Sequence, residues 1–597
     1  MKWGASFPHL VRRWRLPLLA ALATTIVFSL PQWIYWYHGN RGALLLHYDE
    51  PDYVGRLVRA LQGHTTGSPW TVEHGQEPGL VPSYVETALA APFRLACRLG
   101  VCASPDTVLV SYRVVLPALG VMIVADAFYA AGMPLGIAAL VAFWAYCEPS
   151  LVQYQPLIGL VVPQSFLSFD RFSNPLVGVP LFFGAWGCLA RAFGPRNAPA
   201  WAVAAGVLCG ALFYTSFFYW TFFFAVAAGT TALALSRDHL RASITALGVG
   251  VLVAVPYWVG VVALRHVPHY ADLAWRNGVL IHDRGLFYYS NKTMWIFVAG
   301  SAGVWFLERE TSRFLVGSLL GGLALFYSSL VTNVAVQNSH WHYTLAPMLL
   351  GACVWGAERW LRDRRPALTR PLGIAVSLAV AVVGFRTAAR WLRVTDDKPL
   401  PGTGDGDRPY AGAWRWLRDH AGPDDVVLAS EQTMGYVPLR TGRFVWHNAH
   451  AGTSAAGFEE ILERNQVLWW LSRMNVPAFE KRLCAIRGRG VEGWDYGLTP
   501  ELQASLESRG RPPFDPGLSC QLAQVVGNLQ ALVGPGDIRN MGRKYRVDYL
   551  VRGPAEEDWG RADQLLRLAP VFEEGSVRVD RIEGWVEDAV VTGARQP

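Results

Sequence analysis

The sequence lacks the short motifs that mark many soluble enzymes. Its 597 residues contain no P-loop, no G-x-G-x-x-G, no G-x-S-x-G and no internal repeat. The eight cysteines include no C-x-x-C pair and no Cys/His spacing suited to zinc. These absences argue against the common nucleotide-binding sites, against a nucleophile-elbow hydrolase and against a structural metal site.

Charged residues are also scarce. They make up only 17% of the chain, whereas 52% of the residues are hydrophobic, which is more apolar than ordinary globular proteins. The formal net charge is +7, but many arginines lie in short stretches between hydrophobic runs, where the orientation of membrane helices requires them. We interpret the charge as a sign of membrane topology and expect no nucleic acid partner.

Long hydrophobic runs recur from the N-terminus to about residue 390, at lengths suited to a hydrocarbon core of roughly 30 Å. The first run follows four basic residues, is long for a signal peptide and has no cleavage site after it, which favours an uncleaved span with a cytoplasmic N-terminus. The predicted spans number eleven: 16–37, 106–130, 133–147, 175–193, 199–215, 217–235, 242–264, 293–307, 314–332, 343–358 and 371–389.

The basic segments between these spans predict the orientation of the chain. Alternating the spans places RAFGPRN, SRDHLR, LERETSR and ERWLRDRRPALTR on the side of the basic N-terminus, as the positive-inside rule requires. The polar, aromatic-rich loops and everything after the last span then fall outside. We predict a polytopic α-helical membrane domain over residues 1–390 in the cytoplasmic (inner) membrane, with a long first outer loop at 38–105, and an extracytoplasmic domain over residues 391–597.

The outer domain is predicted to alternate helices and strands. AGAWRWLRDHAG and EEILERNQVLWWLSRM have helical spacing, whereas DDVVLAS, GRFVWHNAH and KYRVDYLVRG are typical of strands. VFEEGSVRVDRIEG is typical of a closing strand pair. This order indicates a small α/β domain.

Three carboxylates gather in HYDEPDY, residues 47–53, immediately after the first span. Asp49 or Glu50 at an N-cap, Pro51 at the first helical position and Gly63 just past the end predict an amphipathic helix on the outer membrane surface. Capping accounts for one or two of the acids but not for all three. The alternative is a site in which one carboxylate takes a proton and another holds a cation or orients a hydroxyl.

This arrangement resembles the GT-C superfamily of lipid-linked-sugar glycosyltransferases, in which an acidic pair opens the first outer loop ahead of an amphipathic helix, a many-spanning body and a C-terminal outer domain. HYDEPDY is similar to the Asp-Glu form of that motif in protein mannosyltransferase-like and aminoarabinose transferase-like members. EGWDYG, residues 492–497, lacks the doubled Trp of the W-W-D-Y-G signature of oligosaccharyltransferases, so no subfamily is assigned. The resemblance implies a polyprenyl-phosphate-linked donor and an inverting transfer.

Departure of a lipid phosphate requires cationic groups on the outer side. The candidates are Arg171 in FDRFSNP, Arg284 in HDRG and Lys292. Arg171 lies between two aromatic residues and beside Asp170, just before a predicted span, where a lipid phosphate would lie. Each arginine has the alternative interpretation of an interfacial anchor.

Histidines supply further candidates on the outer side. His340 and His342 in NSHWHY lie at the mouth of a span, where they could bind the phosphate, a sugar hydroxyl or a metal ion. The alternative is that they are polar partners within an aromatic belt. His74 and Glu77 in the first outer loop, with Asp52, complete the predicted substrate-binding residues.

Two charges fall inside a predicted span. Arg113 lies near its outer end and Asp126 near its cytoplasmic end. Charges at such depth face a partner or a cavity. Of the two, only Arg113 lies on the side of the acids.

Two pairs of cysteines share a predicted outer segment. Cys97 and Cys102 lie in the first outer loop, and Cys484 and Cys520 lie in the outer domain. Either pair could form a disulfide in an oxidising compartment. The spacing of the cysteines does not decide whether either pair forms a disulfide.

We therefore predict an inverting GT-C glycosyltransferase that moves a hexosyl or pentosyl group from a polyprenyl-phosphate carrier to a glycan, lipid or protein acceptor at the outer membrane face. Asp49 is the predicted general base, and Glu50 positions the acceptor or binds a divalent metal ion. Arg171, His340 and His342 stabilise the leaving phosphate. Two alternatives remain: a lipid-linked-sugar transporter or flippase, which the shortage of polar residues at the midplane disfavours, and a non-catalytic scaffold for envelope assembly.

Overall fold

Contacts within the chain divide it into two compact units. Unit 1 comprises residues 1–46, 106–259 and 284–400, and unit 2 comprises residues 47–105, 260–283 and 401–597. The first outer loop, which the sequence assigned to the membrane domain, thus groups with the C-terminal segment. The computed structural model describes residues 7–37, 42–45, 50–64, 67–77, 83–147, 172–194, 199–234, 236–270, 298–299, 302–306, 309–332, 338–369, 371, 373–378, 381–382, 384–385, 408–448, 454–473 and 533–586.

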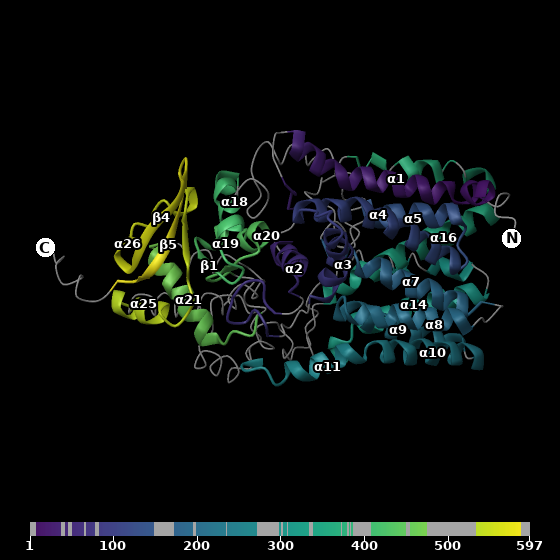
Figure 1. Cartoon of the computed structure of the whole chain (residues 1–597). Coiled ribbons are helices and arrows are strands. Elements are labelled where there is room, and N and C mark those ends of the chain that lie inside the picture. The colour runs from purple at the N-terminus through teal and green to yellow at the C-terminus, as the bar shows by residue number, and fades with distance from the viewer. Residues whose placement is uncertain are drawn as a thin grey trace. The chain divides into compact units, whose positions relative to one another are not determined.

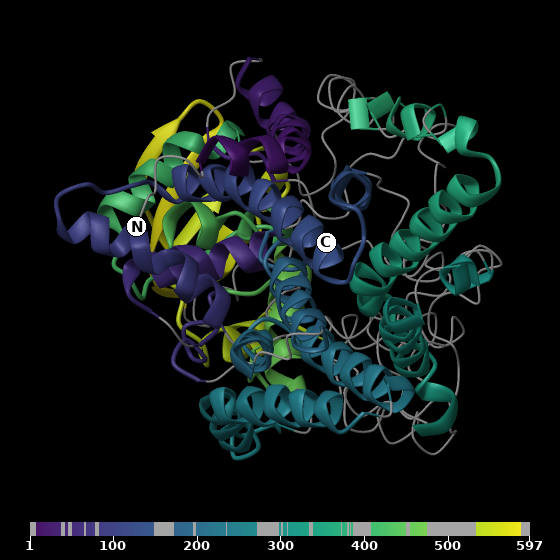
Figure 2. The same ribbon diagram turned by 90° about the vertical axis from the view of Figure 1, so that its right-hand side faces the viewer.

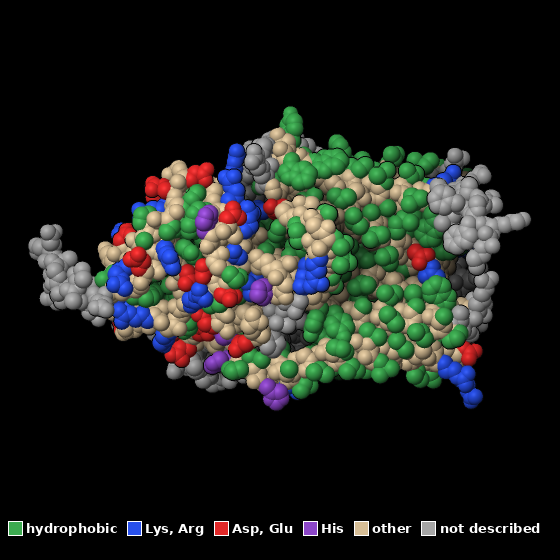
Figure 3. Space-filling view, viewed as in Figure 1, with side chains coloured by type: hydrophobic (Ala, Val, Ile, Leu, Met, Phe, Trp, Pro, Cys, Tyr) green, Lys and Arg blue, Asp and Glu red, His purple; other side chains and the backbone are tan. Residues whose placement is uncertain are grey.

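Unit 1 is a bundle of apolar helices. Most of them run roughly parallel to one another in Figure 1, and Figure 2 views them from one end. Apolar side chains cover the face of this bundle shown in Figure 3. Its elements are α1 (Phe7–Tyr37), α4 (Pro105–Ala130), α5 (Leu135–Cys147), α7 (Gly178–Ala192), α8 (Pro199–Phe213), α9 (Phe217–Ala234), α10 (Arg237–Val253), the start of α11 (Val255–Leu264), η2 (Ala302–Phe306), α14 (Arg309–Phe326), α15 (Ser329–Thr332), η3 (Asn338–Trp341) and α16 (His342–Arg364).

Two of the described helices are long and apolar enough to cross a membrane, Trp14–Tyr37 and Pro105–Ala130. A third candidate is the pair α10 and α11, which the sequence predicted as one straight span but which bends by 53°. Pro256, in the first turn of α11, lacks the N–H that would continue the helix and clashes with the preceding turn. Four further apolar helices in the described residues are shorter, so the count of eleven spans stays a prediction.

Asp126 has a partner inside the bundle. Nη2 of Arg191, at the end of α7, lies 2.6 Å from Oδ1 of Asp126 in α4. The sequence places both residues toward the cytoplasmic ends of their spans, and the ion pair agrees with their lying at one end of the bundle. A charge within a membrane span is expected to be paired in this way.

Helices α9 and α14 approach closely through glycine. A Cβ at Gly321 would overlap the carbonyl oxygen of Ala225, and one at Gly229 would overlap the carbonyl oxygen of Gly317. Small residues permit such contact between backbones, which is a main source of helix association in membranes.

Unit 2 carries a five-stranded sheet of order β2-β1-β3-β5-β4, in which β2, β1 and β3 are parallel and β3, β5 and β4 are antiparallel. The helices and strands expected from the sequence are confirmed in the described residues, including the closing strand pair, whose turn contains Gly575 at φ 61°. The elements are α2 (Glu50–Gln62), α3 (Tyr84–Arg98), the end of α11, η4 (Arg408–Tyr410), α18 (Ala411–His420), β1 (Val426–Leu428), α19 (Glu431–Met434), α20 (Val437–Thr441), β2 (Phe444–Val445), α21 (Phe458–Leu471), α25 (Pro535–Gly542), β3 (Tyr549–Arg552), η7 (Pro554–Glu556), α26 (Ala562–Leu565), β4 (Leu566–Glu574) and β5 (Val577–Trp585).

Replacement of Gly321 by valine should destabilise unit 1. We expect a loss of about 1–3 kcal/mol or more, because the side chain has no room against α9. The matched control is Gly248→Val in α10, where a Cβ meets nothing within 4 Å. Thermal unfolding of the detergent-purified chain provides the measurement, and equal midpoints for the two variants would refute the predicted α9–α14 contact.

Candidate functional site

Six of the nine predicted site residues lie in the described part of the chain. Glu50, Asp52, His74 and Glu77 belong to unit 2, and His340 and His342 belong to unit 1. The other three, Asp49, Arg171 and Arg284, lie outside the described residues.

The segment before the acids is held firmly within unit 1. The backbone N–H of Leu44 donates to Oε1 of Gln32 in α1 at 2.8 Å, and that of Ala43 donates to Oδ1 of Asp106 in α4 at 2.9 Å. Arg113, predicted as a wall of the outer site, is buried and donates to the carbonyl of Leu44. The guanidinium therefore fixes the backbone that leads into HYDEPDY.

Helix α2 follows the acids and has the predicted ends. It begins at Glu50, with Pro51 in its first turn. It ends at Gln62, and the φ of 106° at the next residue, Gly63, favours glycine. The N–H of His64 donates to the carbonyl of Arg59 at 3.0 Å, which satisfies one of the last carbonyl groups of the helix.

The arginines of α2 are buried, although the sequence predicts this helix to lie on the membrane surface. Arg56 and Arg59 have 4% exposure each. The guanidinium of Arg59 lies 4.2 Å from the ring centre of Phe444 in β2. Burial lowers the pKa of Arg59 to about 10, although the charge of Asp424 opposes this effect. Both arginines are buried because the helix packs against the rest of unit 2 on that side.

Asp52 is engaged in a buried ion pair. Its carboxylate accepts hydrogen bonds from the guanidinium of Arg56, one turn along α2. It also accepts one from Nε1 of Trp70 at 3.0 Å. Burial lowers the pKa of Arg56, and the negative charge of Glu86 opposes the shift. These contacts indicate that Asp52 fixes α2 to the loop that follows. Its contact with substrate stays a prediction.

Glu50 differs from Asp52 in its surroundings. Its side chain is fully buried, at 0% exposure, in the first turn of α2. The partial positive charge of a helix N-terminus stabilises a carboxylate at this position. Glu50 is therefore a buried carboxylate in the first turn of α2, next to Asp49 in the sequence.

His74 has a carboxylate at each ring nitrogen. Nδ1 lies 2.6 Å from Oε2 of Glu77, and Nε2 lies 2.9 Å from Oε2 of Glu460 in α21. Burial by itself would lower the pKa of His74, but the two carboxylates outweigh burial and raise it. Burial likewise disfavours the charge of Glu460, yet His74 and Arg464 lower the pKa of Glu460 to about 2. His74 and Glu77 thus bind the C-terminal part of the unit, and their contact with substrate stays a prediction.

Two further contacts join the loop to the same part of unit 2. Glu73 Oε2 lies 2.7 Å from Nη2 of Arg464, whose side chain is 1% exposed. The N–H of Val445 donates to the carbonyl of Trp70 at 2.7 Å, so that the loop extends the hydrogen bonding of the sheet beyond β2. No local pattern in the sequence predicts these partners, because the residues that meet are several hundred positions apart.

His340 and His342 lie where α16 begins, among the aromatic side chains of α9. The ring of His340 stacks on Phe218, with centres 4.4 Å apart. The neighbouring Trp341 donates to Oγ1 of Thr221 at 3.1 Å, and His342 is 5% exposed. The surroundings of both histidines match the alternative interpretation, polar members of an aromatic belt. Their role toward a phosphate stays a prediction.

The described residues contain no group of three or more His, Cys, Asp or Glu side chains that could hold a metal ion. Both nitrogens of His74 already face carboxylates within 3 Å. A divalent ion at Glu50, as the sequence predicts, would need further ligands outside the described residues.

Comparison with solved structures gave several similar chains, of which three are described here. No protein-family model and no curated protein matches the sequence. The Archaeoglobus fulgidus oligosaccharyltransferase tethered with an acceptor peptide is 12% identical over 98% of this chain and 74% of that chain, with a TM-score of 0.45. ArnT from Cupriavidus metallidurans bound to undecaprenyl phosphate is 12% identical over 97% of this chain and 98% of that chain, with a TM-score of 0.47. The mycobacterial arabinofuranosyltransferase AftD is 14% identical over 95% of this chain and 41% of that chain, with a TM-score of 0.47.

The contacts of His74 should make the stability of unit 2 depend on pH. A raised histidine pKa contributes stability that is complete below the unfolded value of about 6.5 and is lost as the pH rises through the folded value. We expect His74→Gln to cost about 1.5–3 kcal/mol at pH 6 and clearly less at pH 9.

Thermal unfolding of the purified full chain and of His74→Gln at both pH values measures this effect. His420→Gln, a change at an exposed histidine, is the control and should show no such trend. A cost of His74→Gln that is equal at the two pH values, or greater at pH 9, would contradict the charged pair.

Proposed function

We propose that this protein is an inverting glycosyltransferase of the GT-C type, which transfers a sugar from a polyprenyl-phosphate carrier to an acceptor hydroxyl at the outer face of the membrane. The supporting observation is the position of the acidic segment in the chain. The chain passes from unit 1 to unit 2 between residues 46 and 47. The residues before this point are bonded to α1 and α4, and those after it start the buried helix α2.

A general base requires such a framework. Proton transfer depends on a carboxylate held within hydrogen-bond reach of the acceptor hydroxyl. In the proposed reaction Asp49 takes the hydroxyl proton, the acceptor oxygen bonds to the anomeric carbon, and the bond from that carbon to the lipid phosphate breaks. Glu50 orients the acceptor or contributes to a divalent cation site, and Asp52 now has a positioning role through Arg56 and Trp70.

The leaving phosphate gains negative charge as the sugar departs, so cationic groups must face it. Arg171, and His340 with His342, remain our candidates, with Arg284 as a further cation. The lipid-linked donor and the inversion follow from the resemblance of HYDEPDY to the family motif. The outer location follows from the basic segments between the predicted spans. The sugar, whether a hexose or a pentose, and the acceptor, whether glycan, lipid or protein, are left to the experiment.

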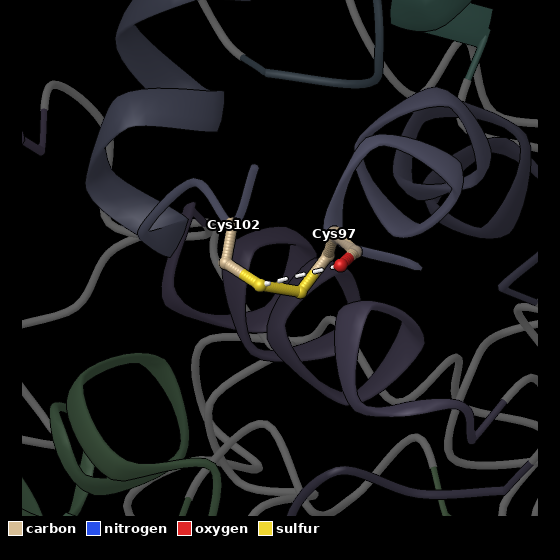
Figure 4. The surroundings of a disulfide bond; sticks show 2 residues. All are labelled: Cys97 and Cys102. Atoms are coloured by element: carbon tan, nitrogen blue, oxygen red, sulfur yellow. Dashed lines mark hydrogen bonds between the residues drawn. A yellow bond between two sulfur atoms is a disulfide. The ribbon is translucent and has the colours of Figure 1, made fainter. Parts of the chain in front are cut away.

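A disulfide supports the outer location of the first loop. Cys97, at the end of α3, is bonded to Cys102 (Figure 4). Disulfides persist in oxidising compartments and are rare in the cytosol. Cys484 and Cys520, the other predicted pair, lie outside the described residues.

The scaffold alternative keeps one argument in its favour. Glu50 and Asp52 are both buried, as residues that only begin and fix a helix would be. The two hypotheses differ over Asp49, since capping tolerates asparagine and base catalysis does not.

We therefore expect Asp49→Asn to lower transfer by roughly 10²–10⁴-fold while leaving thermal stability unchanged. Asp52→Asn is the matched control: it should lower the unfolding temperature, because it leaves the buried Arg56 without a charged partner. The assay incubates purified chain with radiolabelled polyprenyl-phosphate pentoses and hexoses and an envelope extract, and measures label that leaves the polyprenyl lipid. Full activity of Asp49→Asn with a donor that the parent chain uses would exclude Asp49 as the base.

The outer location of unit 2 is open to direct measurement. Ser576 is exposed in the turn between β4 and β5, so Ser576→Cys should react in intact cells with a maleimide that cannot cross the cytoplasmic membrane. The parent chain, measured in the same way, gives the background labelling of the native cysteines. Labelling of Ser576→Cys above that background only after lysis would overturn the topology and the proposed outer site.

A further inference from the structure

We propose that α3 and the disulfide-closed turn after it form a lipid-binding surface, which lies in the headgroup region of the membrane and prefers anionic lipids. The proposal concerns unit 2 and its attachment to the bilayer, and it does not depend on the enzymatic reaction. It also replaces the sequence prediction that α2 is the interfacial helix, because α2 is buried.

Helix α3 has two unlike faces. Glu86 and Ala90 are buried on the face that packs against α2. The opposite face carries Leu95 and Leu99, which are 59% and 77% exposed. At about 100° per residue, the exposed Ala88, Ala91 and Pro92 fall on the same stripe as these leucines. The result is an apolar stripe along the helix with no side chain of the described residues covering its end.

The disulfide adds to this stripe. The bond from Cys97 to Cys102 closes a turn that contains Gly100 at φ 89° (Figure 4). Val101, within that turn, is 70% exposed. Three apolar side chains thus project from one short stretch that a covalent bond holds in shape.

The course of the chain favours lipid as the occupant. Helix α4, one of the two described helices able to cross a membrane, begins at Pro105. Two residues separate it from Cys102, and the three steps from Cys102 to Pro105 span at most about 10 Å. A bilayer crossed by α4 must therefore have its surface close to this turn. An amphipathic helix in that region buries its apolar face about 5–10 Å into the boundary of headgroups and acyl chains.

The basic residues beside the apolar stripe also favour lipid as its binding partner. Arg94 and Arg98 lie on one flank of the stripe, one turn apart. Arginines beside an apolar face snorkel toward lipid phosphates and attract anionic headgroups. A second copy of the chain would need a complementary acidic or apolar surface, which makes self-association the competing outcome of the test.

The test uses the full chain in nanodiscs of neutral and anionic phospholipid, with the photoreactive amino acid p-benzoylphenylalanine at single positions. Leu95 and Leu99 are the test positions. Leu119 in α4, 50% exposed, is the positive control, and Val571 in β4, 36% exposed, is the negative control. After irradiation, mass spectrometry detects lipid adducts, and gel electrophoresis detects crosslinks between chains. All four positions are exposed, so the probe leaves the core intact.

We expect lipid adducts at Leu95, Leu99 and Leu119 and none at Val571. The double change Arg94→Gln with Arg98→Gln should lower the yield at Leu99 severalfold in anionic nanodiscs and leave it unchanged in neutral ones. Adducts at Leu119 without any at Leu95 and Leu99 would overturn the proposal. Crosslinks between chains at these two positions would also overturn it, in favour of self-association.

A separate experiment tests whether the disulfide holds Val101 at the membrane. With the probe at Val101, the double change Cys97→Ser with Cys102→Ser should reduce the yield of lipid adducts severalfold. The yield at Leu95, inside the helix, should persist. A yield at Val101 that does not respond to loss of the disulfide would refute the role assigned to the bond.

Discussion

Burying charge is favourable only where partners are supplied, and this constraint organises the first outer loop. Arg56 and Asp52 pair within one turn of α2, and Trp70 provides the remaining hydrogen bond. Because removing either partner would leave an uncompensated buried charge, the helix and the following loop keep one arrangement. This pairing also holds the start of α2, where the other carboxylates lie in the sequence. A reaction that uses Asp49 would therefore depend on the pairing of Arg56 with Asp52.

The fold was largely accessible from the sequence because its signals are local. Short runs of apolar residues in DDVVLAS and KYRVDYLVRG predicted β1 and β3, and Gly63 and Gly575 marked the end of a helix and a turn. Each of these patterns lies within a single element or turn. The bend before Pro256 was not predicted, because hydropathy alone does not distinguish a straight span from a broken one.

The candidate site was less accessible because its contacts are long-range. The sequence singled out His74 and Asp52 as polar groups near the acids, but their partners Glu460 and Trp70 follow from tertiary packing. From the sequence alone, a buried arginine such as Arg59 would be expected to face solvent. The helical pattern shows which face of the helix is polar, but it does not show which other elements pack against that face. The outcome is that several residues predicted to bind substrate hold the protein together.

Unit 2 is built from three stretches that are far apart in the chain, and this has a consequence for its biogenesis. His74 and Glu460 are separated by 386 positions. At roughly 5–20 residues per second, the first loop waits about 20–80 s after its synthesis before the ribosome completes α21. During that interval Arg59 and His74 have no strand or helix to pack against, and membrane helices are being inserted on both sides of the loop. The emerging loop therefore requires a chaperone or the membrane surface to shield it until the last third of the chain arrives.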